Sequence, residues 1–221
     1  MRVIFGGTFD PVHVGHLRMA MELGELLEDA FPRARKPGLV DLLPCYEAVH
    51  KSGVAATPEQ RKEMLKLSIP PESVLRLDER ELRREAPSYT VDTLRELRLE
   101  LGVEPLVLAM GSDSAISMPN WKEVEVYAQL CHVIVIRRPG DSSVFSNDFL
   151  CSVGFECASA IEQLNESESG LVFEVELKLL DISSSDIRTR VSEGRSIRYL
   201  VSGAVEQYIC DNALYTKTLG G

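Results

Sequence analysis

The sequence predicts an α/β fold: a doubly wound parallel sheet with helices on both faces and a small C-terminal helical part. Three observations predict it. Apolar runs of strand length alternate with helical patterns along most of the chain, which is typical of βαβ units. The run at 105–110 is continuously apolar, as expected of a central parallel strand buried on both faces. Polar residues follow the predicted strands, at the edge where such sheets bind ligands.

The first unit is a strand, a turn and a helix within the first 31 residues. Residues 3–5 are apolar and form a short strand, which Gly6 and Gly7 end. Glycines at this place permit a positive φ and the close approach of a ligand. After the turn dipeptide at 10–11, apolar spacing predicts a helix over about 16–31.

The middle of the chain continues the alternation. Strands are predicted over residues 39–44 and 74–77. Between them, Thr57 is an N-cap, Pro58 occupies the first helical position and Gln60 completes a capping box. This combination is a strong helix start.

A charged run and a further helix start come next. Residues 78–86 are so rich in charge that a solvated loop or helix face is expected. A helix then opens at 87–90 and ends at Gly102, a suitable C-cap. Another helix is expected to begin at 119–121, where a proline provides the start.

The last third of the chain adds two strands, at 132–136 and 172–180, and closes with helices. The polar, serine-rich stretch between these strands predicts a helix between loops. We therefore expect one Rossmann-like domain over residues 1–221, with a variable insert at 141–170 and the C-terminal helical part at 183–221.

Composition limits the classes of function and location. The net charge of -10 argues against a general affinity for nucleic acid or for anionic membranes. The five cysteines are scattered and contain no C-x-x-C, as expected of reduced thiols in a cytoplasmic protein. We expect no signal peptide and no membrane span, because the first apolar run meets glycine early and no run is long enough. The oligomeric state stays open, a homo-oligomer included.

The first strand-to-helix corner has the chemistry of a phosphate site. Free N–H groups and the positive end of the helix dipole suit an anion. His13 and His16 can donate hydrogen bonds to phosphate oxygens, and either can carry charge near neutral pH. Alone, the pair fits a plain corner with two solvated histidines about equally well. A zinc pair lacks a further His or Cys at ligand spacing, and neither G-x-G-x-x-G nor a Walker loop is present.

A second corner of this kind lies near the C-terminus. Ser183, Ser184 and Ser185 precede a predicted helix, and Arg188 lies on its first turn. Serines there can cap the helix or donate to phosphate, and arginine adds a forked charge. Alone, a serine N-cap with a solvated arginine is the favoured interpretation. Two such corners in one chain point to a triphosphate ligand.

These motifs resemble those of a known superfamily. Residues 6–16 and 182–188 are similar to the HxGH and ISSTxxR-type motifs of the nucleotidyltransferases. Within that superfamily, the chain resembles the bacterial nicotinate-nucleotide adenylyltransferases through residues 78–82, 86–94, 111–113, 120–121 and 137–140.

The resemblance implies adenylyl transfer from ATP to nicotinate mononucleotide, which gives nicotinate adenine dinucleotide and pyrophosphate. It implies Mg²⁺ bound mainly through the ATP phosphates, and direct in-line attack with catalysis by positioning and charge stabilisation. Two alternatives stay open. One is a sibling adenylyltransferase with phosphopantetheine or nicotinamide mononucleotide as acceptor. The other is a non-catalytic nucleotide-binding regulator, against which the intact His13 and His16 argue.

The resemblance also implies which residues act on ATP, with no metal ligand among the side chains. His13, His16 and Arg188 match the catalytic positions. The backbone of the glycine turn would cradle phosphate, and the serine corner would hold the leaving pyrophosphate. The complete set implied for ATP is Gly6, Gly7, Thr8, Phe9, His13, His16, Gly111, Asp113, Arg137, Ser183, Ser184, Ser185 and Arg188.

A separate set is implied for the mononucleotide. Lys51 would meet its phosphate, and Asp113 would contact both nucleotides. Thr90 and Trp121 would recognise nicotinate, Trp121 by stacking on the ring. The family often has Pro-Pro-His before the basic residue, where this chain has Ala-Val-His at 48–50.

Overall fold

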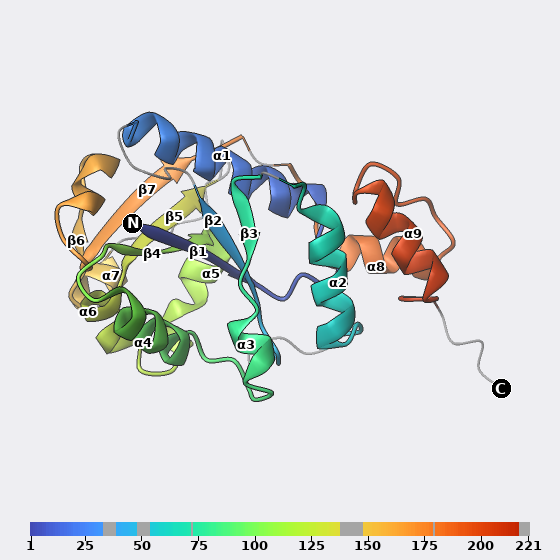
Figure 1. Ribbon diagram of the computed structural model, residues 1–221, viewed down its shortest axis with the longest axis horizontal. Helices are drawn as coiled ribbons and strands as arrows, with labels where there is room; N and C mark the ends of the chain where they lie inside the picture. Colours follow the sequence, from blue (N-terminus) through green and yellow to red (C-terminus); the bar gives the residue numbers. More distant parts are fainter. Residues whose placement is uncertain (33–38, 48–53, 72, 138–147, 179, 217–221) are drawn as a thin grey trace.

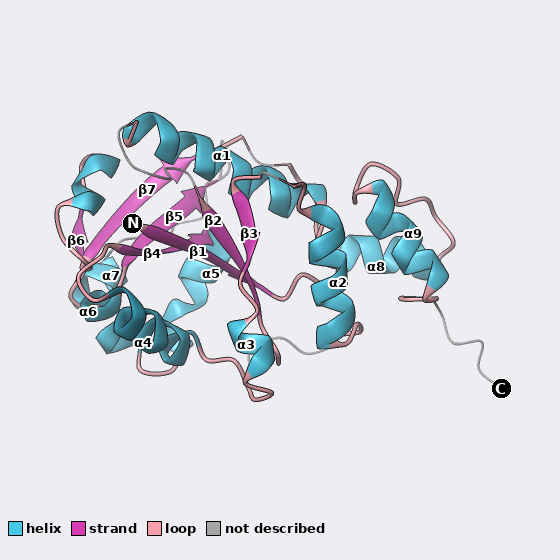
Figure 2. Ribbon diagram, viewed as in Figure 1, coloured by secondary structure: helices cyan, strands magenta, loops and turns pink. Residues whose placement is uncertain are grey.

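A parallel sheet forms the centre of the protein. The computed structural model describes residues 1–32, 39–47, 54–71, 73–137, 148–178 and 180–216. Within them, seven strands pair in parallel in the order β3-β2-β1-β4-β5-β7-β6 (Figures 1 and 2). The chain order reverses between β1 and β4, so their carboxyl ends flank a switch point. The strands are β1 (Arg2–Gly7), β2 (Val40–Pro44), β3 (Leu75–Leu77), β4 (Leu106–Gly111), β5 (His132–Arg137), β6 (Glu156–Cys157) and β7 (Leu171–Glu176).

Helices cover both faces of the sheet, as predicted. The helices are α1 (Val14–Ala30), α2 (Pro58–Ser68), α3 (Arg80–Arg83), α4 (Thr90–Leu101), α5 (Ser112–Ser117), α6 (Tyr127–Leu130), α7 (Asp148–Ser152), α8 (Ser184–Ser192) and α9 (Gly203–Asp211), with 3-10 turns η1 (Met118–Asn120), η2 (Val124–Val126) and η3 (Ile161–Asn165). Figure 1 shows α1 and α4 on opposite sides of the strands. Among the described residues, no helix has the length and apolar character to cross a bilayer.

The alternation of side chains along the strands creates two cores. In β1, Val3 and Phe5 join the cluster packed under α1, α2 and α9, whereas Ile4 joins the cluster under α4, α5 and α6. Successive residues of a strand point to opposite faces, so a strand buried on both faces must be apolar throughout. The central strand β4 meets this demand from Leu106 to Met110.

The predicted start of α2 is confirmed, whereas the bounds of one strand and one helix need correction. Thr57 and Gln60 form the predicted capping box at the start of α2. The strand predicted over 172–180 is shorter, because β5 ends opposite Glu176 and offers no further partner. The prediction that a helix begins at 119–121 is wrong. Trp121 is the C-cap of the short turn η1, and the left-handed φ of 52° at Glu123 separates that turn from η2.

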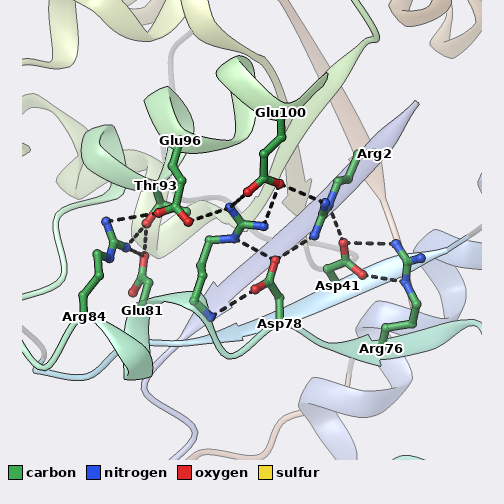
Figure 3. A network of polar contacts seen from close by, with 10 residues as sticks. Arg2, Asp41, Arg76, Asp78, Glu81, Arg84, Thr93, Glu96 and Glu100 are labelled. Atoms are coloured by element: carbon green, nitrogen blue, oxygen red, sulfur yellow. Dashed lines mark hydrogen bonds and ion pairs between the residues drawn. The ribbon is translucent and has the colours of Figure 1, made fainter. Parts of the chain in front are cut away.

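The charged run at 78–86 is solvated only in part: Arg83, Glu85 and Ala86 are exposed as expected, whereas other members are shielded by ion pairs. The Asp78 side chain is only 10% exposed because it accepts hydrogen bonds from Arg2 and Arg80, at 2.7 and 2.8 Å. Asp41 on β2 lies between Arg2 and Arg76, each 2.7 Å away (Figure 3). Buried charges are retained when they are paired in this way.

The same network contacts α4 along its length. Arg80 forms ion pairs with Glu96 and Glu100 of α4, both at 3.1 Å. Glu81 is buried and accepts a hydrogen bond from the Thr93 hydroxyl at 2.6 Å (Figure 3). Burial raises the pKa of the Glu81 carboxyl despite its hydrogen bonds. The result is that α4 is tied from its first turn to its last turn to the charged run that follows β3.

Candidate active site

The two predicted phosphate corners meet in one cleft of about 600 Å³ at the carboxyl ends of β1 and β4. Gly7 and Arg188 both line it, although they lie far apart in the sequence. Its walls are formed by the loop after β1, the start of α5 directly after β4, the first turns of α1 and the start of α8. The lining includes twelve of the predicted residues: Gly6, Gly7, Thr8, Phe9, His13, His16, Gly111, Asp113, Ser183, Ser184, Ser185 and Arg188.

Within the glycine pair, Gly7 is required for space, and neither glycine has a positive φ. Strand β1 continues through Gly7, and the left-handed residue is Phe9, with φ 52°. A Cβ on Gly7 would lie 2.9 Å from the Phe9 ring, whereas a Cβ on Gly6 would meet nothing within 4 Å. The buried Phe9 ring packs edge-on against His16, with centroids 5.1 Å apart. Phe9 therefore supports the imidazole that lines the cleft.

His13 is a neutral hydrogen-bond donor. It is the N-cap of α1, and its Nδ1 accepts the backbone N–H of His16 at 3.3 Å. An accepting Nδ1 places the proton of the neutral ring on Nε2. Burial lowers the pKa of His13 to about 4, so the expectation that this histidine carries charge near neutral pH is wrong. The expectation fails because burial is set by the fold.

The depressed pKa of His13 predicts an acid-sensitive contribution to stability. Because the folded pKa of about 4 lies below the ordinary 6.5, the unfolded chain binds a proton first as pH falls, and stability is lost between these two values. Asparagine at position 13 keeps an N-cap acceptor but does not titrate. We expect Tm to fall less between pH 7 and pH 5 in His13→Asn than in the wild type, measured by thermal unfolding.

A second buried histidine contributes equally to the acid sensitivity of the wild type and of the variant. Burial also lowers the pKa of His132, and that contribution is present in both proteins. Equal decreases of Tm in the wild type and in His13→Asn would contradict the role of His13.

His16 lies in the first turn of α1, and its ring lies beside that of His13. The two imidazole rings stack with centroids 3.6 Å apart and planes 22° apart. His16 is half-buried, and both rings line the cleft. Two imidazoles stacked at a helix start can bind neighbouring oxygens of one polyphosphate.

The serine corner is attached directly to the loop that follows β1. Ser184 donates its hydroxyl to the carbonyl oxygen of Pro11 at 2.9 Å, and Arg188 Nη1 donates to the carbonyl oxygen of Asp10 at 2.8 Å. Ser183 caps α8 by accepting the N–H of Asp186 at 3.1 Å, which leaves its hydroxyl proton for a ligand. The second corner is therefore held in a fixed position relative to the first.

Asp10, predicted only as part of a turn, is a residue of the cleft lining with several buried hydrogen bonds. It is 2% exposed, and its carboxylate accepts the N–H groups of Ala55 and Ala56, at 2.8 and 3.1 Å. It also accepts the hydroxyl of Tyr215 at 2.8 Å. Burial and the adjacent Asp10 raise the pKa of Tyr215. In the sequence, the only indication of this role is that the Asp10 carboxylate lies among the apolar residues Phe9, Pro11 and Val12.

The predicted pyridine-binding residues Thr90 and Trp121 lie together, outside the described lining of the cleft. Tyr127 is buried, which raises its pKa; the Thr90 side chain is one of its hydrogen-bond partners. The Trp121 ring is 6.1 Å from the Tyr127 ring, and its indole N–H donates to Ser117 Oγ at 3.1 Å. The structure thus brings Thr90 and Trp121 together around one aromatic residue.

Two further predicted residues are not part of the described cleft lining. Arg137 ends β5 and forms an ion pair with Glu174 at 3.2 Å, while its neighbour Ile136 lines the cleft. Lys51 belongs to segment 48–53, which lies outside the described residues.

Comparison with known proteins gives consistent matches over nearly the whole chain. A cytidylyltransferase-like family model matches residues 4–190. A relative from Marinobacter nauticus is 41% identical over 97% of this chain and 96% of its own length. One from Methylococcus capsulatus is 37% identical over 97% and 99%. Both carry the name "Probable nicotinate-nucleotide adenylyltransferase".

Solved structures agree in fold. The nicotinic acid mononucleotide adenylyltransferase of Plasmodium falciparum, in complex with NaAD, superposes with a TM-score of 0.67 at 18% identity, and the match covers 96% of each chain. At this identity the likeness is one of fold alone. The sequence matches go further: the chain belongs to the nicotinate-nucleotide adenylyltransferase family, within the cytidylyltransferase-like proteins.

Proposed function

We infer that the protein transfers the adenylyl group of ATP to nicotinate mononucleotide, and releases pyrophosphate as it forms nicotinate adenine dinucleotide. Family membership supports this reaction. The observation that carries it in the structure is the single cleft in which both phosphate-binding corners meet. A cleft with donors on two walls suits a triphosphate, which has to be held at both ends of the bond that breaks.

The reaction needs no covalent intermediate on the protein. An oxygen of the mononucleotide phosphate attacks the α-phosphorus of ATP, and the bond from that phosphorus to the bridging oxygen breaks. Negative charge develops on the phosphoryl oxygens and on the departing pyrophosphate. We assign Nε2–H of His13, the His16 ring and the Arg188 guanidinium to this charge, since all three line the cleft.

The remaining cleft residues bind ATP in this proposal. The exposed Gly6 lets the backbone approach phosphate closely, and Ser183 and Ser185 lie at the start of α8. Asp113 is exposed at the rim and is assigned to the nucleotides.

Mg²⁺ fits this cleft as a partner of ATP. The Asp10 carboxylate already accepts three hydrogen bonds, whereas Asp113 is an exposed carboxylate on the lining. Magnesium is commonly held by substrate phosphates with one or two carboxylates and water. We propose that it enters on the phosphate oxygens, where it would neutralise part of their charge.

The acceptor is proposed to bind between α4 and η1. Trp121 would stack on the pyridine ring, and Thr90 opens α4, whose N-cap Tyr89 forms no side-chain cap bond. An uncapped helix start favours an anion such as the nicotinate carboxylate. Lys51 is proposed to meet the phosphate of the mononucleotide.

The direct test is a substrate comparison on the purified protein with ATP and Mg²⁺. We expect pyrophosphate release and dinucleotide formation with nicotinate mononucleotide. Turnover of phosphopantetheine or nicotinamide mononucleotide in its place would identify a sibling transferase. Nucleotide binding without turnover of any acceptor would identify a regulator.

Replacing Trp121 by alanine is expected to act on one substrate. Loss of a stacked aromatic costs ~1–3 kcal/mol, so we expect KM for nicotinate mononucleotide to rise about tenfold, with little change in KM for ATP. Steady-state kinetics with each substrate varied in turn measures this, and Trp121→Phe is the matched control that retains a ring. Equal effects on both KM values would contradict stacking.

A further inference from the structure

Arg61 is an arginine on α2 that lies wholly inside the protein. It is 1% exposed, and its guanidinium reaches three backbone carbonyl oxygens. Nη1 donates to Thr8 at 2.8 Å and to Cys45 at 2.7 Å, and Nη2 donates to Tyr46 at 2.7 Å. A planar fork of donors is what allows one side chain to bind three oxygens from two separate segments.

Among the described residues, the Arg61 guanidinium does not form an ion pair. Within the described part of the chain, its guanidinium has no carboxylate within 4.0 Å, and its Nε is buried without a hydrogen-bond partner. Burial of a cation without a counter-charge is costly, and apolar residues of similar volume often give equal or greater stability. The three directed bonds are therefore the property that distinguishes arginine from an apolar residue here.

The carbonyl groups that Arg61 binds belong to the ends of two adjacent strands. Thr8 follows β1 and lines the cleft, where the ATP phosphates are proposed to bind. Cys45 and Tyr46 follow β2, and the N–H of Cys45 donates to the Gly7 carbonyl oxygen at 3.1 Å. Arg61 thus fixes the phosphate loop relative to the segment after β2.

That segment in turn holds the start of the pyridine-side helix. The N–H of Tyr46 donates to the Ser88 hydroxyl at 2.9 Å, and the N–H of Ser88 donates to the Glu47 carbonyl oxygen at 3.2 Å. Two residues further on, Thr90 opens α4. Hydrogen bonds therefore connect Thr8, through Arg61 and Tyr46, to the segment that is proposed to bind nicotinate.

We propose that Arg61 is a positioning residue that sets the separation between the bound ATP and the bound mononucleotide. The proposal rests on the function inferred above. Direct transfer requires the attacking oxygen and the α-phosphorus to be about 3–3.5 Å apart, and a displacement of about 1 Å can cost roughly 100-fold in rate. A residue that fixes both binding segments therefore acts on turnover more than on the affinity for either substrate.

The test compares Arg61→Lys with Thr57→Ala. Lysine keeps the charge but presents no fork to the three carbonyl groups, whereas loss of the Thr57 cap weakens the same helix without touching them. Assayed well below the Tm of each variant, Arg61→Lys is expected to lower kcat at least tenfold. Its Kd for ATP, measured by calorimetry, should stay within about threefold of wild type. Thr57→Ala should keep kcat within about twofold.

A second variant keeps the proposal testable if Arg61→Lys does not fold. Ser88→Ala removes the acceptor of the Tyr46 N–H, and we expect it to lower kcat about threefold with unchanged Kd for ATP. Normal kcat in either folded Arg61→Lys or Ser88→Ala would overturn the proposal. Equal losses of kcat in Arg61→Lys and Thr57→Ala at equal losses of Tm would also overturn it. A wild-type protein that forms no dinucleotide would instead overturn the proposed function, and this proposal with it.

Discussion

Replacement of His16 by alanine is expected to lower kcat about 100-fold. The His16 ring lines the cleft, stacked on His13 and supported by Phe9. Loss of one preorganised donor from a site of developing charge typically costs ~3 kcal/mol, and each 1.4 kcal/mol is about tenfold in rate. The fold should persist, because His13 accepts the backbone N–H of residue 16 and not its side chain.

The measurement is steady-state kcat with both substrates saturating. Arg18→Ala is the matched control, since Arg18 lies two residues along the same helix, is exposed, and pairs with Glu22. We expect this control to retain wild-type turnover. A His16→Ala protein with kcat within threefold of wild type would remove His16 from the chemistry.

Replacement of Arg188 by alanine is expected to lower kcat/KM for ATP by about two orders of magnitude. The arginine lines the cleft and donates to the carbonyl oxygen of Asp10 at 2.8 Å, which orients its guanidinium. A charged donor of this kind contributes ~3 kcal/mol when it binds charge that develops in the reaction. Arg188→Lys should lie between alanine and wild type, because it keeps the charge without the fork.

The control for this prediction is Arg190→Ala. Arg190 lies on the same helix and pairs with the Asp186 carboxylate at 2.8 Å. Kinetics with ATP varied, together with calorimetric binding of pyrophosphate, should show losses in Arg188→Ala and none in Arg190→Ala. Equal kinetics in the two variants would place Arg188 outside the site.

The alternation of strands and helices was predictable because it depends on local periodicity. A strand buried on both faces must be apolar throughout, which made β4 evident at 105–110. The start of α2 was predictable because Thr57 and Gln60 bond only to backbone atoms within the same turn. In both places the determining interactions are local or depend on burial alone.

Other features depend on partners that are distant in sequence. The Asp78 side chain is largely shielded from solvent because it meets Arg2, 76 residues earlier, and nothing local in the run at 78–86 reveals this. The turn at Trp121 depends on the left-handed conformation of Glu123, a conformation that glycine usually adopts. Propensity gives no warning of a non-glycine residue held in that region.

The candidate site also combines features that were predictable from the sequence with features that were not. The two corners were predictable because serines, histidines and glycines beside helix starts have a direct chemical meaning. The neutral state of His13 was not, because burial decides it. The roles of Asp10 and Arg61 were not predicted, because their hydrogen bonds connect segments that are distant in sequence. Asp10 and Tyr215, for example, are 205 residues apart.

Because segments that are distant in sequence form the cleft, the cleft is incomplete during most of the protein's synthesis. The bonds from Ser184 to Pro11 and from Arg188 to Asp10 span 173 and 178 positions. At ~5–20 residues per second of translation, the histidine corner is synthesised roughly 9–35 s before the serine corner. During that interval the nascent chain lacks the α8 wall of its cleft. It should therefore bind ATP weakly and catalyse nothing until that wall is synthesised.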